Sequence, residues 1–300
     1  MTMTNINKFN THIISKPFTY HQPETVEEAV NLLHKQSEVK ILAGGTDLIP
    51  KMKQRLFNPK HIINLKKIPS LKGIKETERG IWIGATTKLR DIEKSKLVKE
   101  KIPLQYQCVK TIGSVQIRNM GTLGGNVCNA SPAADGALGL IALNATIHIT
   151  GINGERDVAV EDFFRGPGES VLGKDELVTG FTVPAPEEAT GFHFISIGRM
   201  ALDISTISVA VTVTLREGEV SDSRICLGSV APVPLRLKKV EGYLMGKELR
   251  VDVITEAAER VSAGIKPIDD LRASAEYRRE AAKGLMMEAL YMAKRKAEAN

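Results

Sequence analysis

The sequence is organised around Thr122-Leu123-Gly124-Gly125-Asn126, which runs on to Ala130-Ser131-Pro132-Ala133-Ala134-Asp135. A shorter stretch upstream, Ala43-Gly44-Gly45-Thr46-Asp47, also joins a glycine pair to polar residues. Glycine permits a positive φ, and a turn leading into a helix exposes backbone N–H groups that suit an anion. Either stretch alone is explained more simply by a tight turn. Together they predict one ligand with a diphosphate, held between two backbone cradles.

Polar side chains around the second stretch strengthen this prediction. Thr122 and Ser131 supply hydroxyls, Asn126 supplies an amide and Asp135 a carboxylate. Such groups suit phosphate oxygens and the hydroxyls of a ribose or ribityl chain. The pattern therefore favours a nucleotide ligand.

Hydrophobic periodicity predicts alternating strands and helices in the first part of the chain. The first glycine pair falls at a turn between a strand at 39–43 and a helix at 47–54. The other elements expected before residue 184 are a helix at 23–33, strands at 61–65, 81–85, 146–150, 156–160 and 176–183, and helices at 88–92 (capped by Thr87), 103–111 and 136–143.

The pattern changes after Pro184-Ala185-Pro186, which we interpret as a domain boundary. Three strands of an antiparallel meander are expected next, followed by two helices. Their expected ranges are 192–198, 207–215 and 219–229 for the strands, and 253–263 and 273–296 for the helices. The sequence thus predicts an α+β protein with domains at 1–186 and 187–300, and a loose arm at 1–15.

Composition excludes several classes of protein. The net charge of +6 comes largely from scattered lysines and aromatic residues are only 5% of the chain, which argues against nucleic-acid binding. Cys108, Cys128 and Cys226 form no CxxC pair, so we expect no disulfide, no metal site and no iron–sulfur cluster in this chain. Without a signal peptide or a membrane span, the expected location is the cytoplasm.

The usual catalytic and nucleotide motifs are absent. The sequence has no G-x-G-x-x-G, no P-loop, no H-E-x-x-H and no G-x-S-x-G, and no triad or carboxylate pair stands out. A chain that holds a large cofactor without an acid–base set fits redox chemistry, in which the cofactor reacts. We therefore predict no catalytic residue here.

Residues 41–48, 116–126 and 130–135 together resemble the FAD-binding medium subunit of the molybdenum hydroxylases, the family of xanthine dehydrogenase and aerobic carbon monoxide dehydrogenase. The resemblance covers nearly the whole chain, with weaker matches at 173–178, at Arg199 with Asp203-Ile204-Ser205, and at 274–279. It implies a two-lobed FAD-binding domain of the vanillyl-alcohol-oxidase or PCMH type, with lobes at about 1–70 and 71–186. A smaller C-terminal domain with a three-stranded antiparallel sheet and a helical bundle would follow.

The resemblance also implies roles for individual residues. Residues 42–47 would wrap the FAD diphosphate, residues 122–126 would close its other side, and Cys128 would lie against the isoalloxazine ring. Asp135 would bind sugar or ribityl hydroxyls. The full implied set of cofactor-binding residues is Ile41, Leu42, Ala43, Gly44, Gly45, Thr46, Asp47, Gly113, Ile117, Gly121, Thr122, Gly124, Gly125, Asn126, Cys128, Ser131, Asp135, Leu177 and Val178.

The implied function is an electron relay. A large subunit would hold the molybdenum cofactor and a small subunit [2Fe–2S] clusters, as a dimer of heterotrimers, and FAD would pass electrons to NAD, a quinone or another acceptor. Two departures stand out: no lysine lies between Phe192 and Arg199, and no cysteine-bearing insertion would hold a [4Fe–4S] cluster.

Two alternatives stay open from the sequence. One is a stand-alone FAD-dependent oxidoreductase of the same fold, and the other is a non-redox nucleotide-binding module. The substrate is not identified in any of these interpretations, because the relay would act on electrons released on another chain.

Overall fold

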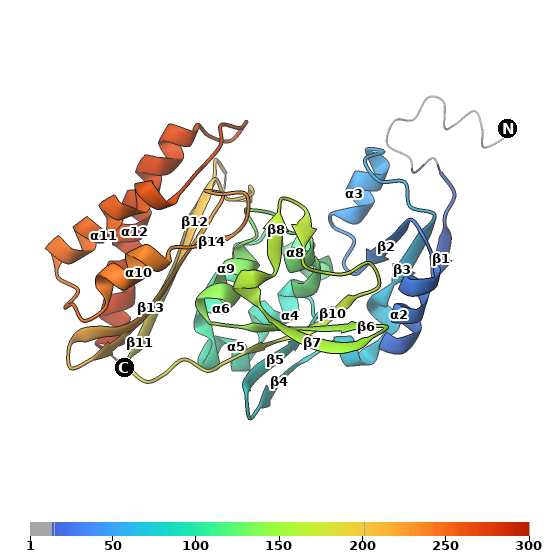
Figure 1. Ribbon diagram of the computed structural model, residues 1–300, viewed down its shortest axis with the longest axis horizontal. Helices are drawn as coiled ribbons and strands as arrows, with labels where there is room; N and C mark the ends of the chain where they lie inside the picture. The colour runs from blue at the N-terminus through green and yellow to red at the C-terminus, as the bar shows by residue number, and fades with distance from the viewer. Residues whose placement is uncertain (1–13, 15, 201, 300) are drawn as a thin grey trace.

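Three sheets lie side by side along the long axis of the molecule (Figure 1). The computed structural model describes residue 14, residues 16–200 and residues 202–299. The arm predicted at 1–15 lies almost entirely outside the described residues. We call the three parts the N-terminal lobe (19–71), the central lobe (74–183) and the C-terminal layer (190–297).

The N-terminal lobe is a parallel sheet in the order β1-β3-β2. Thr25 begins its main helix by accepting a hydrogen bond from the Glu28 amide, and the helix buries Ala29 and Leu33 against the strand residue Ile63. The elements are β1 (Thr19–His21), α2 (Val26–Lys35), β2 (Val39–Leu42), α3 (Leu48–Lys53), β3 (His61–Asn64), η1 (Leu65–Lys67) and η2 (Pro69–Leu71).

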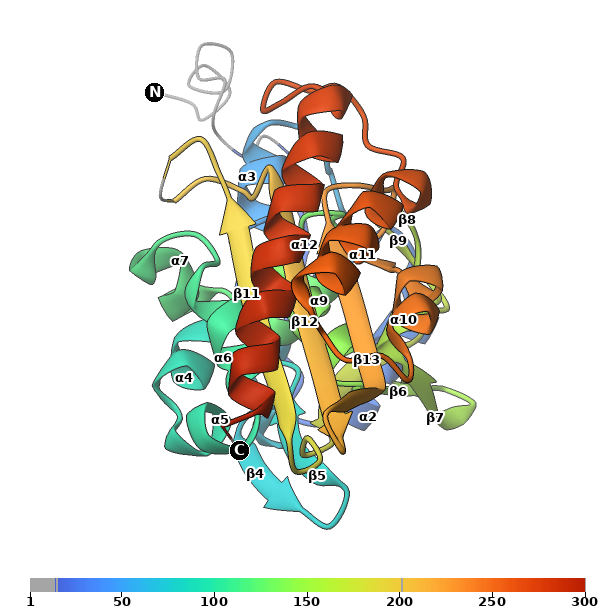
Figure 2. The same cartoon turned by 90° about the vertical axis from the view of Figure 1, so that its left-hand side faces the viewer.

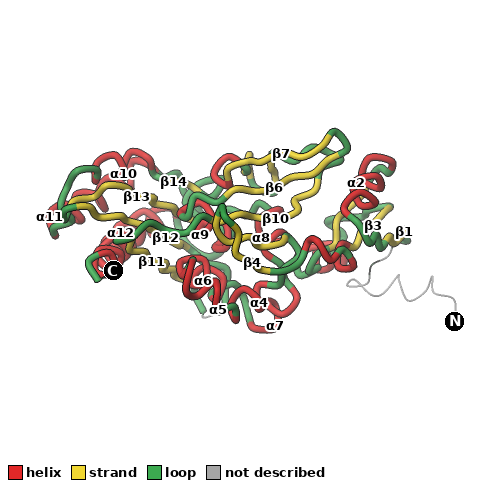
Figure 3. The backbone as a smooth tube through the Cα atoms, turned by 90° about the horizontal axis from the view of Figure 1, so that it is seen from below, coloured by secondary structure: helices red, strands yellow, loops and turns green. Residues whose placement is uncertain are grey.

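The central lobe is an antiparallel sheet in the order β4-β5-β10-β6-β7. Phe181 of β10 lies opposite Ile83 and Ile147, and all three are buried in the core beneath the helices that cover one face (Figure 3). The strands are β4 (Ile74–Thr77), β5 (Gly80–Gly84), β6 (Thr146–Gly151), β7 (Gly154–Ala159) and β10 (Leu177–Val183), and a small hairpin adds β8 (Phe164–Gly166) and β9 (Glu169–Ser170). The helices are α4 (Leu89–Lys94), α5 (Lys96–Lys101), α6 (Pro103–Lys110), α7 (Val115–Met120), α8 (Leu123–Cys128), α9 (Asp135–Ala142) and η3 (Val160–Asp162).

The C-terminal layer is an antiparallel sheet in the order β11-β12-β13-β14. The long helix α12 lies across the outer face of this sheet, with α11 beside it (Figure 2). The inner face packs on α9, so Ala210 and Cys226 belong to the core of the central lobe. The elements are β11 (Thr190–Ile197), β12 (Ile207–Arg216), β13 (Glu219–Gly228), β14 (Leu235–Arg236), α10 (Lys238–Leu244), α11 (Val251–Gly264) and α12 (Ala275–Ala297).

Most of the predicted elements are confirmed, with four corrections. The C-terminal sheet has a short fourth strand, β14, and three helices follow it rather than two. The sequence reading also missed several short elements, which are two to six residues long and carry little periodicity: β1, β4, β8, β9, α5, α7 and the 3₁₀ helices η1, η2 and η3. Thr87 does not cap α4, because its hydroxyl accepts from the Gly73 amide and donates to the Gly73 carbonyl.

The second glycine stretch is the fourth correction. It is not a turn: residues 123–128 form the helix α8, with Thr122 as its N-cap. Separately, no helix that the structure describes combines the length and the hydropathy that a membrane span requires.

Gly191 of β11 tests the packing of α12. A Cβ at this position would overlap the carbonyl oxygen of Ala293 in α12. We expect Gly191→Ala to lower the free energy of unfolding by about 1–3 kcal/mol through overpacking. Urea denaturation would measure it, with Gly242→Ala in α10 as the control, since a Cβ there meets nothing within 4 Å. Equal stability of the two variants would contradict this packing.

Candidate cofactor-binding site

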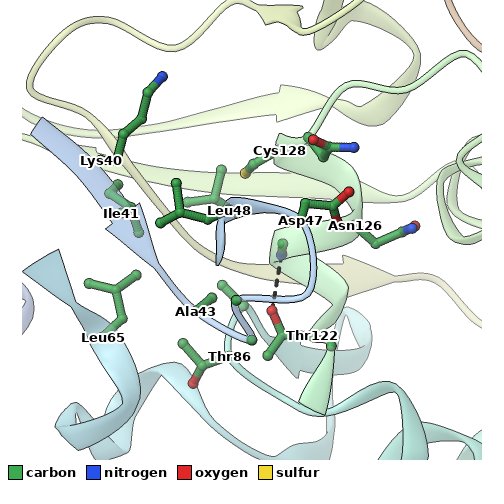
Figure 4. A pocket seen from close by; sticks show the side chains of 18 of the residues that line it. Lys40, Ile41, Ala43, Asp47, Leu48, Leu65, Thr86, Thr122, Asn126 and Cys128 are labelled. Atoms are coloured by element: carbon green, nitrogen blue, oxygen red, sulfur yellow. Dashed lines mark hydrogen bonds between the residues drawn. The ribbon is translucent and has the colours of Figure 1, made fainter. Parts of the chain in front are cut away.

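A cavity of about 450 Å³ lies between the N-terminal and central lobes (Figure 4). Most of the residues predicted for the cofactor line it. These are Ile41, Ala43, Gly44, Gly45, Thr46, Asp47, Ile117, Gly121, Thr122, Gly124, Gly125, Asn126, Cys128, Leu177 and Val178. The four predicted residues that do not line it are Leu42, Gly113, Ser131 and Asp135.

The loop after β2 offers unpaired backbone donors to this cavity. The amides of Gly44, Gly45, Thr46 and Asp47 donate to no other described residue. Gly45 has a φ of +80°, a left-handed conformation that turns the chain so that successive N–H groups gather. An arrangement of this kind binds an anionic oxygen, as a diphosphate would supply.

The start of α8 is different, because its amides are already used. Gly124 donates to the carbonyl of Ala85 at 2.9 Å, and Gly125 donates to the Thr122 hydroxyl at 3.0 Å. Leu123 and Asn126 also donate within the protein. The prediction of a second backbone cradle is therefore wrong. Helix α8 therefore contributes its side chains to the cavity, together with the flat surface left by Gly124 and Gly125.

The glycines of the two stretches allow close backbone contacts, Gly44 between the two lobes and Gly124 within the central lobe. A Cβ on Gly44 would overlap the carbonyl oxygen of Met120 and would come within 2.8 Å of the Gly121 Cα. A Cβ on Gly124 would lie 2.6 Å from the carbonyl oxygen of Ala85, which belongs to the same lobe. A side chain at position 44 would therefore separate the two walls of the cavity, whereas one at position 124 would push α8 away from the end of β5.

Arg118 holds the segment before α8 in place. Its buried guanidinium donates to Glu93 Oε2 at 2.8 Å and to the carbonyls of Ile112 and Gly113 at 3.1 and 2.9 Å. Burial tends to raise the pKa of Glu93, but hydrogen bonds from Arg118 and Arg90 outweigh it and hold this pKa below its usual range. Gly113 was predicted among the cofactor-binding residues; its carbonyl accepts from Arg118, and its contact with the cofactor stays a prediction.

A second ion pair fixes the wall at the start of β10. Arg156 donates to both carboxylate oxygens of Glu176 at 2.7 Å and to the carbonyl of Val171 at 3.0 Å. Glu176 also accepts from the Gly173 amide, and these contacts hold its pKa below the usual range. The pair sets the position of the 171–177 segment, which includes the lining residue Leu177.

Across the cavity mouth, Lys51 of α3 donates to Asn129 Oδ1 at 2.8 Å, joining the two lobes directly. Neither residue was predicted. The other lining residues that sequence reasoning missed are Leu33, Val39, Lys40, Leu48, Phe57, Leu65, Ala85, Thr86, Leu89, Ile112, Gly168, Leu172, Gly173 and Glu176. For Ala85 and Thr86 a signal existed, because Ala85 ends the predicted strand at 81–85 and Thr86 directly follows it.

Asp135 lies beside the cavity wall rather than in it. Its side chain is 6% exposed, and its Oδ2 accepts from the Ser205 hydroxyl at 2.8 Å. Its Oδ1 is buried and has no partner among the described residues. The structure thus uses Asp135 to join α9 to the C-terminal layer, and its predicted contact with cofactor hydroxyls stays a prediction.

The residues present fit a dinucleotide. Besides the free amides, the buried Oδ1 of the lining residue Asn126 has no hydrogen-bond partner in the described chain. Burial raises the pKa of the Cys128 thiol to about 12, so this side chain is a neutral, apolar part of the wall. Ile41, Leu48 and Leu177 supply further apolar surface. The free amides suit the phosphates of a dinucleotide, the polar side chains suit its sugars, and the apolar wall suits its ring.

Comparison with known proteins agrees with this geometry. Residues 16–186 match the family described as the FAD binding domain in molybdopterin dehydrogenase, and residues 192–293 match the CO dehydrogenase flavoprotein C-terminal domain. The glyceraldehyde dehydrogenase medium chain of Sulfolobus acidocaldarius is 38% identical, over 91% of this chain and 96% of the relative. The xanthine dehydrogenase FAD-binding subunit of Escherichia coli O157:H7 is 32% identical, over 87% and 90%.

A solved structure has the same fold over nearly the whole chain. The carbon monoxide dehydrogenase of Hydrogenophaga pseudoflava includes a chain that superposes with a TM-score of 0.90 at 36% identity, covering 93% of this chain and 98% of that one. The chain therefore belongs to the FAD-binding medium subunits of the molybdenum-containing dehydrogenases.

The contact at Gly44 predicts a specific loss. We expect Gly44→Ala to push the 43–47 loop away from Gly121 and to weaken FAD binding by about 5- to 150-fold, since overpacking costs about 1–3 kcal/mol. Visible absorbance per chain, during titration with FAD, would measure this. Gly284→Ala is the control, because a Cβ there meets nothing within 4 Å. Unchanged FAD affinity in Gly44→Ala would contradict the assignment.

Asp135 predicts a dependence on pH. Burial raises its pKa from 3.8 to about 6, against the opposing hydrogen bond from Ser205. A carboxyl whose pKa is raised by folding contributes more stability when protonated, so its ionisation removes stability as the pH rises from about 4 to about 6. The neutral variant Asp135→Asn should therefore exceed the wild type in free energy of unfolding at pH 7, by up to about 3 kcal/mol.

Urea denaturation at pH 4, 5, 6 and 7 would test this. The advantage of Asp135→Asn should shrink towards zero at pH 4, whereas the exposed control Asp91→Asn should show no such trend. A variant whose stability falls further below that of the wild type as the pH rises would show that the ionised form is the stabilising one.

Proposed function

We propose that this chain is the electron-transfer subunit of a molybdenum hydroxylase complex. The observation that carries the proposal is the row of four unpaired amides, 44–47, in a cavity between two lobes that meet at glycines. Residues 1–186 would form the FAD-binding domain of the PCMH type, with lobes at about 1–70 and 71–186. Residues 187–300 would form the C-terminal domain.

In this proposal each wall of the cavity has its own task. The amides of 44–47 hold the diphosphate, while the hydroxyl of Thr122 and the side chain of Asn126 approach from the other lobe. Cys128 gives the ring an apolar surface, and Leu177 and Val178 lie near the adenine or the ring edge. FAD supplies the redox chemistry, and the chain supplies binding, orientation and exclusion of water.

The substrate is proposed to lie on another chain. Relatives named for glyceraldehyde, carbon monoxide and xanthine are all 32–38% identical to this chain. Relatives named for such different substrates have medium subunits that resemble this chain to a similar degree. We infer that the residues of the medium subunit do not select the substrate. A large molybdenum-cofactor subunit and a small [2Fe–2S] subunit, in a dimer of heterotrimers, are the proposed partners. The cytoplasmic location stays a prediction.

The visible spectrum and the copurifying chains test this proposal. We expect the chain, purified from its own cells, to show flavin absorption bands and to bring with it a molybdenum-containing large chain and an iron–sulfur chain. A purified chain without flavin bands, and without their return on adding FAD, would refute the relay. Turnover of an alcohol by the chain alone would instead establish a stand-alone flavoenzyme.

A further inference from the structure

Three hydrogen-bonded side chains form a line across the central sheet, outside the cofactor cavity. The Thr182 hydroxyl of β10 lies 2.7 Å from Nε2 of His148 in β6, and Nδ1 of the same ring lies 2.6 Å from Asp157 Oδ1 in β7. None of the three residues lines the cofactor cavity. The sequence alone showed no triad, because 34 positions separate Thr182 from His148 and only the sheet brings them together.

The pairing of three strands fixes this arrangement. His148 lies opposite Asp157 on one side and opposite Gly180 on the other, and Thr182 is two residues beyond Gly180. Side chains two residues apart on a strand share a face of the sheet. This face is opposite to the one of Phe181, so it is turned away from the helices α4, α5 and α6 (Figure 3). The three groups are therefore held by the ladder of a sheet rather than by a loop.

The proton of the His148 ring has a defined place. Burial tends to raise the pKa of Asp157, but hydrogen bonds from His148 and Arg79 outweigh it and hold this pKa below the usual range. Asp157 is thus an acceptor, and the Nδ1–H of the ring donates to it. Nε2 of the neutral ring is then left as an acceptor for the Thr182 hydroxyl. A hydroxyl paired with a base that a third group orients is the arrangement of an activated nucleophile.

An indole N–H lies on the same face, beside the hydroxyl. Trp82 of β5 is directly opposite Thr182, and a Cβ on Gly180 would lie 2.8 Å from its Nε1. This N–H donates to no other described residue, so it is available to an oxygen that becomes negative during a reaction. Thr182 is 8% exposed, which limits access to its hydroxyl to small groups.

We propose that Thr182 is a nucleophile that accepts a small acyl group from an activated ester. Its oxygen attacks the carbonyl carbon, and the hydroxyl proton passes to Nε2 of His148. The bond to the leaving alcohol then breaks, this proton passes to the leaving oxygen, and an ester of Thr182 remains. Asp157 is a positioning residue, because it acts through the ring. This activity uses the side chains of the chain itself and does not rest on the proposed electron transfer.

The probe is p-nitrophenyl acetate, added to the whole chain with its FAD. Mass spectrometry of peptides should find an acetyl group on Thr182 that hydroxylamine removes, as it removes esters and not lysine amides. Thr182→Val should abolish this label. His148→Gln should slow its formation at least about a hundredfold, because a general base contributes about 10²–10⁴ in rate. Thr146→Val is the matched control, since it removes a hydroxyl directly opposite Thr182 that is not bonded to His148.

The role of Asp157 has a test of its own. Asp157→Asn should slow the acetylation at least about tenfold, because a ring without its carboxylate no longer keeps Nε2 free for the hydroxyl. Asp157→Glu should restore most of the rate, whereas urea denaturation should find the two variants equally stable. If His148→Gln loses its FAD, this pair of variants decides the same question.

Three results would overturn the proposal. The first is acetylation of lysines without an ester on Thr182. The second is a label on Thr182 that forms as fast in His148→Gln as in the wild type, which would make it an ordinary hydroxyl. The third is an equal loss of the label in Thr146→Val and Thr182→Val. Flavin bands retained by each variant show that its fold is intact.

Discussion

The close contact between the 43–47 loop and Gly121 is the constraint on which the cavity depends. It requires glycine at position 44, since any Cβ there would overlap the backbone at Met120. Because the lobes meet at this point, the unpaired amides of one lobe lie opposite the side chains of Thr122 and Asn126 on the other. Lys51 and Asn129 add a direct hydrogen bond between the same two lobes.

The two glycine pairs look alike in sequence and perform different tasks. The first leaves its amides free and so presents positive backbone dipoles. The second begins a helix whose first amides are used by Thr122, Ala85 and Thr87. Glycine at 124 is required because α8 packs directly on the end of β5. The wall at 44–47 therefore supplies free N–H groups for a negatively charged ligand. The wall at α8 has no bulky side chain at 124 and can pack close to β5.

The sequence predicted the order of the longer elements and about half of the residues that line the cavity, because both depend on local signals. Strand and helix periodicity placed the turn at Gly44-Gly45 correctly. The use of the α8 amides was missed, since it depends on Ala85 and Thr87, which are distant in sequence. Arg118 was missed for a similar reason: nothing in a run of 115–120 shows that Glu93 and the Gly113 carbonyl will enclose it. Lys40 and Lys51 look like ordinary surface lysines until the fold brings them to the cavity.

Leu177 and Val178 are adjacent in β10 and yet belong to different cores. Leu177 is packed among the α2 and β3 residues of the N-terminal lobe, while Val178 is packed in the central lobe. Separating the lobes therefore extracts the buried Leu177 from its neighbours, at a cost of about 1.5–3 kcal/mol. Where release of the dinucleotide proceeds through separation of the lobes, a barrier raised by this amount slows it by roughly ten- to a hundredfold. Leu177 would then lengthen the residence time of the cofactor without touching its chemistry.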